Sequence, residues 1–293
     1  MRKAGSVMMG AAAIGLVLVA LTGCGSSSSG SALDPVAKAA DVTASAKSFD
    51  LTMSGNVSAG GLSFALQGNG AFDETNKVGN FNFSIPNFPG SSGGLSFKEL
   101  FNNYVIYIGF PNGLPGGARL PGGKPWIKID LQKALASKGI NLGQLSGLAG
   151  NDPSQYLSYL RSTGQVKKIG TETVQGVSTT HYHAIINLQQ VAKKLGQLSP
   201  AAKTGFQGLL KTTGSFNIPV DVWIDGNNMV RQERVSYGSS TGTTPFNLTL
   251  TLDLSNFGTP VSVTPPPASQ VFDATSLATQ GSSGQTGTTP TIP

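Results

Sequence analysis

The chain has 293 residues and a formal net charge of +6, and only 12% of its residues are charged. Soluble domains usually carry about a quarter charged residues, so the groups that perform acid–base, metal and phosphate chemistry are scarce and most enzyme classes are disfavoured. One cysteine excludes an intramolecular disulfide and a cysteine-based metal cluster, and two histidines leave little for a transition-metal site. We therefore expect no metal, no cofactor and no catalytic residue.

The basic residues form no concentrated patch. Lys167-Lys168 and Lys193-Lys194 are isolated pairs, which are typical of a solvated surface. Nucleic-acid binding needs a dense basic surface, so nucleic acid is not an expected partner.

The N-terminus predicts export. Residues 1–23 begin with Arg2 and Lys3, continue with an apolar run from Val7 to about Leu21, and end in small residues. This order is that of a secretory signal peptide. An alternative is a membrane-spanning anchor, but the uncharged stretch grades into Gly and Ser after residue 24 and lacks a stop-transfer flank.

The cleavage region resembles the lipobox of bacterial lipoproteins. Leu21-Thr22-Gly23-Cys24 places the single cysteine after a small residue. The resemblance implies that Cys24 receives a diacylglyceryl group and becomes the first residue of the mature chain. Residues 24–33, rich in Gly and Ser, then form a flexible tether between the membrane and the folded domain.

Periodicity predicts the elements that follow. Asp34-Pro35 starts a helix that runs to about residue 48. Alternating apolar residues predict ten strands near residues 49–53, 62–66, 81–85, 104–108, 126–130, 166–173, 177–186, 218–224, 229–237 and 246–254. Further helices are expected at 131–138, from 152 to about 160, and at 188–211. The Gly- and Pro-rich loop 109–125 fits no regular structure.

These elements predict one α+β domain over residues 34–258. We expect a curved, antiparallel, half-open β-barrel that is wrapped around or backed by α-helices. Residues 259–293 are rich in Pro, Ser, Thr and Gly and are expected to form a largely disordered tail, in which only Val271-Phe272 could dock.

The apolar residues that alternate along the strands present more hydrophobic surface than one amphipathic helix can cover. An ordinary packed core is the default explanation, because every sandwich or barrel has such a face. The alternative is an apolar cavity, whose candidate ligand-binding residues are Leu62, Phe64, Leu66, Phe81, Phe83, Ile85, Ile106, Ile108, Val220, Val222, Ile224, Leu248, Leu250 and Leu252.

The polar residues form no recognisable catalytic set. His181 and His183 share a strand face, but they are interpreted as ordinary half-exposed residues because the sequence supplies no further ligand beside them. Trp223 is expected to pack at the core or its rim, with Asp221 and Asp225 facing solvent. The chain has no Gly-X-Ser-X-Gly elbow, and its acidic residues are scattered singly.

Several segments together resemble the actinobacterial LppX/LprG-type lipoproteins, which are relatives of the periplasmic carrier LolA. They are the lipobox at Cys24, the strand Trp126-Ile-Lys-Ile-Asp-Leu131, the hairpin Gly170-Thr-Glu-Thr-Val-Gln-Gly-Val-Ser-Thr-Thr-His-Tyr-His183 and the strand Ile218-Pro-Val-Asp-Val-Trp-Ile-Asp-Gly226. The resemblance implies a half-open antiparallel barrel with an apolar cavity that carries acylated lipids or glycolipids.

The expected function is that of an envelope lipoprotein, anchored through Cys24 to the outer face of the cytoplasmic membrane. It would bind a lipid, a glycolipid or another hydrophobic ligand for transfer or presentation. One alternative is a structural or protein-interaction module with a filled core. A third hypothesis is a hydrolase, which the sequence disfavours because it shows no nucleophile–base pair.

Overall fold

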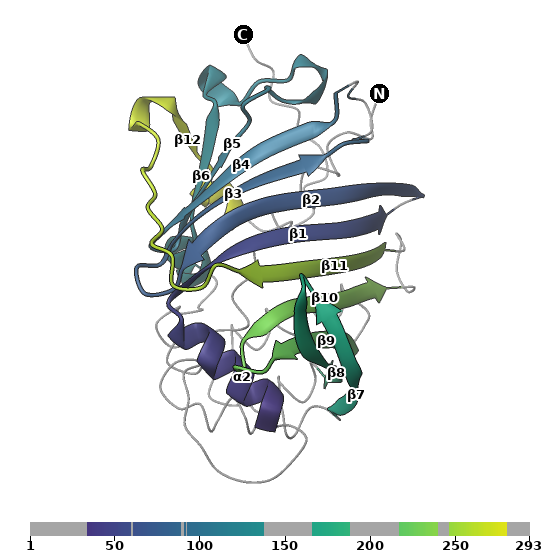
Figure 1. The fold of residues 1–293 in the computed structure, drawn as a ribbon. Coiled ribbons are helices and arrows are strands. Elements are labelled where there is room, and N and C mark those ends of the chain that lie inside the picture. The colour runs from purple at the N-terminus through teal and green to yellow at the C-terminus, as the bar shows by residue number, and fades with distance from the viewer. Residues whose placement is uncertain are drawn as a thin grey trace.

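The computed structural model describes residues 34–59, 61–88, 91, 93–137, 166–187, 217–239 and 246–279. Its main feature is one sheet of twelve strands in the order β12-β6-β5-β4-β3-β2-β1-β11-β10-β9-β8-β7 (Figure 1). The strands are β1 (Ser48–Ala59), β2 (Leu62–Asp73), β3 (Val78–Ile85), β4 (Leu95–Asn102), β5 (Val105–Gly109), β6 (Trp126–Asp130), β7 (Lys167–Val174), β8 (Val177–Asn187), β9 (Asn217–Asp225), β10 (Val230–Ser239), β11 (Phe246–Ser255) and β12 (Val271–Asp273).

The sheet is curved and open. All neighbouring strands pair antiparallel except β12, which runs parallel to β6. Strand β1 pairs with β2 on one side and with β11 on the other, so the first and last long strands lie together at the centre of the sheet. Within the described part of the chain, β12 and β7 each have a single neighbour. The expected curved, half-open antiparallel architecture is therefore present as an open sheet.

Helices are sparse in the described residues. Helix α2 (Asp34–Ser45) confirms the expected first helix, although it ends before Lys47, whose φ of 69° is left-handed. It packs on β9 and β10, where Ala39 is fully buried and the Thr43 hydroxyl accepts a 2.8 Å hydrogen bond from the Val230 amide. No described helix is long and apolar enough to span a bilayer.

The remaining described helices are short and give little backing to the sheet. Helix α3 (Leu131–Ala136) confirms the expectation at 131–138, and Asp130 caps it by accepting a 3.0 Å hydrogen bond from the Lys133 amide. Helix α8 (Thr275–Thr279) follows β12. The helices expected at 152–160 and 188–211 lie outside the described residues.

All ten expected strands are present, but strand β4 was not expected. Its inward positions are Leu95, Phe97, Glu99 and Phe101, in register with the aromatic face of β3. Glu99 interrupts the apolar alternation, and it is nevertheless only 7% exposed. A charged residue type on the buried face therefore hid this strand from a hydrophobicity pattern.

The loop between β5 and β6 is more regular than expected. It contains two 3₁₀ turns, η2 (Pro115–Gly117) and η3 (Pro121–Gly123), so the expectation of no regular structure over 109–125 is wrong. Each turn places its two glycines at positive φ, between 65° and 72°, which side chains with a Cβ adopt only with strain. The Pro-Gly-Gly repeat therefore encodes the turn.

The segment expected to belong to a largely disordered tail adds to the sheet. A 3₁₀ turn, η4 (Ala268–Gln270), leads into β12, where Val271 pairs with Trp126 and Phe272 with Ile127. Asp273 accepts a 2.9 Å hydrogen bond from Lys128. Residues beyond 258 thus contribute to the sheet, because the backbone of β12 pairs with the edge of β6.

The turn from β9 to β10 is held by Asp225. Its carboxylate accepts hydrogen bonds from the amides of Asn227 (2.8 Å) and Met229 (2.9 Å) and from Arg231 Nε (2.7 Å). Burial opposes ionisation, but these donors lower the pKa of Asp225. Asp225 is 6% exposed, so the expectation that it faces solvent is wrong. It serves the turn, as Asx residues commonly do.

Candidate functional site

The register of the strands puts the expected apolar residues on one face of the sheet, which we call the inner face. One row across it runs from Leu252 of β11 through Met53 and Gly68 to Phe83 and Phe97. All fourteen candidate residues lie on this face. They are Leu62, Phe64, Leu66, Phe81, Phe83, Ile85, Ile106, Ile108, Val220, Val222, Ile224, Leu248, Leu250 and Leu252.

The inner face divides into two clusters. The larger one, the aromatic cluster, is built on β1 to β4 and β11 and contains Phe81, Phe83, Phe97, Leu250 and Leu252 among its buried residues. Ten of the fourteen candidates are buried, whereas Phe64, Ile108 and Leu248 are half-buried against this cluster and Leu62 is exposed.

The smaller cluster lies under helix α2. Val220, Val222 and Ile224 pack there with Ala39 and Val230. A helix already covers these three candidates, so this end of the inner face is an ordinary filled core. The candidates on β2, β3, β5 and β11 lie outside it.

Aromatic rings form the floor of the larger cluster. Phe83 stacks on Phe97 with ring centroids 4.8 Å apart, and Phe81 lies 6.2 Å from Phe83. Gly68 lets the Phe83 ring lie on the backbone of β2, since a Cβ there would come within 2.7 Å of the ring. The missing side chain at Gly68 thus leaves the space that the Phe83 ring occupies.

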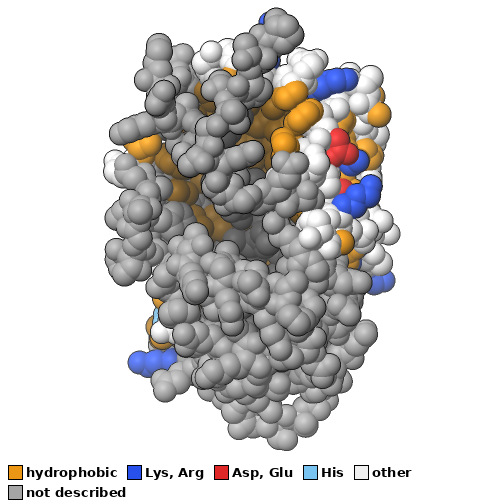
Figure 2. Space-filling view, turned by 180° about the vertical axis from the view of Figure 1, so that it is seen from behind, with side chains coloured by type: hydrophobic (Ala, Val, Ile, Leu, Met, Phe, Trp, Pro, Cys, Tyr) orange, Lys and Arg blue, Asp and Glu red, His pale blue; other side chains and the backbone are white. Residues whose placement is uncertain are grey.

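Figure 2, seen from behind relative to Figure 1, shows a hollow in the surface of the molecule. Hydrophobic side chains dominate the described part of its wall, and charged side chains gather on the surface beside it. The inner face carries the described apolar clusters, so we assign the hollow to that face.

Two carboxyl groups interrupt the inner face. Glu99 lies between Phe81 of β3 and Ile108 of β5, and Glu233 of β10 lies beside Leu252 of β11. Burial raises the pKa of each to about 7. Glu233 Oε2 is shut off from solvent, and no described residue forms a hydrogen bond with it.

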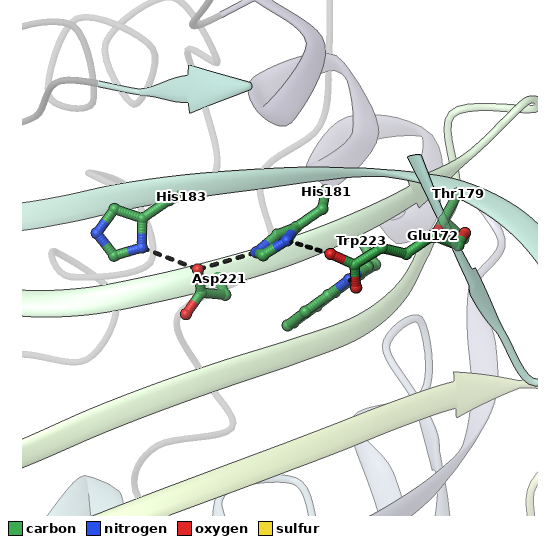
Figure 3. A network of polar contacts seen from close by, with 6 residues as sticks. All are labelled: Glu172, Thr179, His181, His183, Asp221 and Trp223. Carbon is green, nitrogen blue, oxygen red and sulfur yellow. Dashed lines mark hydrogen bonds and ion pairs between the residues drawn. The ribbon is translucent and has the colours of Figure 1, made fainter. Parts of the chain in front are cut away.

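The opposite face of β7, β8 and β9 carries a polar network (Figure 3). His181 Nδ1 lies 2.8 Å from Glu172 Oε1, and His181 Nε2 lies 3.0 Å from Asp221 Oδ1. His183 Nδ1 contacts the same Asp221 oxygen at 2.8 Å, and Trp223 Nε1 donates to Glu172 Oε2 at 2.8 Å. The histidines are thus linked through carboxylates, a pairing that sequence spacing did not reveal because the four partners come from three strands.

The network perturbs its carboxylates. Hydrogen bonds from Trp223 and then His181 lower the pKa of Glu172. Burial opposes ionisation of Asp221, yet the hydrogen bonds from His183 and His181 lower its pKa. Its members satisfy one another, and among the described residues no group of three or more His, Cys, Asp or Glu side chains is placed so that it could hold a metal ion. The arrangement is that of a structural network that ties β7 to β9.

Comparisons with known proteins give partial similarities. No family model matches the chain. An uncharacterised 31.2 kDa protein of Streptomyces griseus, from the rplA-rplJ intergenic region, is 31% identical over 162 residues, which are 55% of this chain and 52% of that protein. The chain therefore spans about half the length of this curated relative.

Among solved structures, the chain is similar to the lipoprotein LppX of Mycobacterium tuberculosis. The TM-score is 0.46 at 15% identity, over 80% of this chain and 98% of LppX. LprF of Mycobacterium bovis gives a TM-score of 0.41 at 13% identity, over 80% of this chain and 96% of LprF.

Proposed function

We propose that this chain is an envelope lipoprotein that binds a hydrophobic ligand with acyl chains on its inner face. Its anchor is the acylated Cys24, at the outer face of the cytoplasmic membrane, and the Gly/Ser segment 24–33 is its tether. The ligand is a lipid or glycolipid that the protein transfers or presents. The observation that carries the proposal is the aromatic cluster of the inner face together with the hollow seen in Figure 2.

The mechanism is partition between apolar environments. Each methylene group shielded from water contributes about 0.8 kcal/mol, so an acyl chain laid along the aromatic floor gains affinity without directional bonds. Phe64, Ile108 and Leu248 are half-buried at the border of the cluster, where they are able to contact both the cluster and a ligand. No bond is made or broken in this process, and no catalytic residue is required.

The alternative function is that of a module with a filled core that binds a protein partner. The small cluster under α2 favours it locally, because Val222 and Ile224 already pack against a helix. The two functions differ in whether the aromatic cluster accepts a ligand from solution.

A fluorescent fatty-acyl probe tests the proposal. The protein is residues 24–293, produced without the leader so that Cys24 carries no acyl chain. We expect saturable uptake by the wild type and at least a tenfold loss in Ile108→Arg, with little change in melting temperature, because the arginine head can extend toward the hollow.

The matched control is Thr52→Arg on the opposite, exposed face of β1. It should bind the probe as the wild type does. Absence of probe uptake by a folded wild type would refute the carrier and favour the filled module.

A further inference from the structure

Glu233 is the most isolated polar group of the inner face. The residue is 8% exposed, and its Oε2 atom is the one buried side-chain nitrogen or oxygen without a hydrogen-bond partner among the described residues. Its neighbours in register are Val222 of β9 and Leu252 of β11. The Oε2 atom has left water without replacing the hydrogen bonds it lost, which is unfavourable. Its presence points to a partner that the described residues do not supply.

Glu233 also occupies a boundary. Val222 belongs to the small cluster that α2 covers, whereas Leu252 belongs to the aromatic cluster. An acyl chain lying on the aromatic cluster and directed toward α2 therefore reaches Glu233 where the filled core begins. This is the position at which the polar end of the ligand would stop.

We propose that Glu233 binds the neutral, hydroxyl-bearing head of an acylated ligand, such as a glycerol or sugar ester, whose acyl chain lies on the aromatic cluster. This inference rests on the proposed function, since it assumes that the inner face holds an acyl chain. When the head binds, it replaces the side chains that cover Glu233 Oε2, and a ligand hydroxyl donates a hydrogen bond to this atom, which removes the unsatisfied acceptor.

The chemistry around Glu233 disfavours charged heads. Burial raises its pKa to about 7, so near neutral pH the carboxyl both donates and accepts, as a hydroxyl does. A fatty-acid carboxylate or a phosphate would meet a like charge whenever Glu233 ionises. The nearby basic residues of β10 are engaged elsewhere: Arg231 with Asp225, and Arg234 over the Trp223 ring. A cationic head would have to lose water beside Val222 and Leu252.

The test compares two ligands with the same acyl chain, monooleoylglycerol and oleate, as competitors of the fluorescent acyl probe on residues 24–293. The wild type should prefer monooleoylglycerol. Glu233→Leu should weaken monooleoylglycerol about tenfold, which is the effect of one net hydrogen bond, and leave oleate unchanged or tighter. Glu233→Gln, which keeps donor and acceptor atoms, should retain most of the preference.

Glu99→Leu is the matched control, because Glu99 is a similarly buried carboxyl on the same face with β3, β2, β1 and β11 between it and Glu233. It should leave the ratio of the two affinities unchanged. An unchanged ratio in Glu233→Leu, or in Glu233→Ala if the leucine variant does not fold, would overturn the inference, as would a wild-type preference for oleate. If the folded wild type binds no acyl ligand at all, the proposed function itself fails.

Discussion

His181 stacks on Trp223, with ring centroids 4.2 Å apart and 15° between the ring planes. The guanidinium of Arg234 lies 5.1 Å from the centroid of the same indole, so a cation and an imidazole both contact Trp223. Trp223 is 2% exposed although it lies on the face opposite the apolar clusters. Trp223 is thus buried among polar side chains on this face of β9.

Trp223→Ala should destabilise the domain by about 3–5 kcal/mol, as expected for truncating a buried aromatic side chain. The change also removes the donor to Glu172 and the surface on which His181 stacks. Urea unfolding followed by circular dichroism measures the difference. A loss below about 1 kcal/mol would show that the network does not stabilise this edge of the sheet.

The histidines should not bind zinc tightly. Both ring nitrogens of His181 contact carboxylates, Nδ1 that of Glu172 and Nε2 that of Asp221. His183 contacts Asp221 through Nδ1. Isothermal titration of the wild type and of a variant with His181→Gln and His183→Gln should give negligible zinc binding to both. Stoichiometric, high-affinity zinc uptake by the wild type alone would contradict the structural role.

Glu233 should make stability fall as pH rises. Burial raises its pKa in the folded state to about 7 from a model-peptide value near 4.5, so between these pH values the folded state holds more protons than the unfolded state. The free energy of unfolding is therefore highest below about pH 4.5, and it falls by about 3 kcal/mol as the pH rises through about 7. Glu233→Gln should therefore gain stability relative to the wild type between pH 5 and pH 8.

Chemical unfolding of both proteins at several pH values measures this difference. Glu99→Gln is expected to behave similarly, because burial raises its pKa to about 7 as well. A constant difference between wild type and Glu233→Gln from pH 5 to pH 8 would show that Glu233 is solvated in the folded protein.

Val222→Arg should unfold the domain, in contrast to Ile108→Arg. Val222 is 4% exposed and packs with Ala39 under helix α2. An unpaired charge there costs several kcal/mol, against a total stability of about 5–15 kcal/mol for a typical domain. Thermal melting of the two arginine variants compares them, and a native-like Val222→Arg would mean that α2 does not close this end of the inner face.

The sequence pattern predicted the strands well where apolar residues alternate without interruption. Every residue of the expected apolar phase of β11 lies on the inner face, because period two fixes the side of the sheet on which a side chain lies. The same pattern missed β4, whose inward position Glu99 is a carboxyl, and it missed β12, which has three residues and depends on the edge of β6.

The polar parts of the molecule were less predictable. Asp225 was expected at the surface, but its carboxylate organises a turn through backbone amides that no side-chain pattern reveals. His181, Asp221 and Glu172 lie on three strands, so only the register of β7, β8 and β9 brings them together. The isolation of Glu233 likewise follows from the strands and helix around it, not from its sequence neighbours.

Organic extraction and mass spectrometry of residues 25–293 test the central claim most directly, because this chain lacks Cys24 and its own anchor cannot be confused with ligand. Purified from a cytoplasm or membrane extract without detergent, the folded wild type should yield an acylated, neutral lipid in near-stoichiometric amount, and Ile108→Arg should yield far less. A folded protein that carries no lipid and takes up none when it is offered in vesicles would contradict the account.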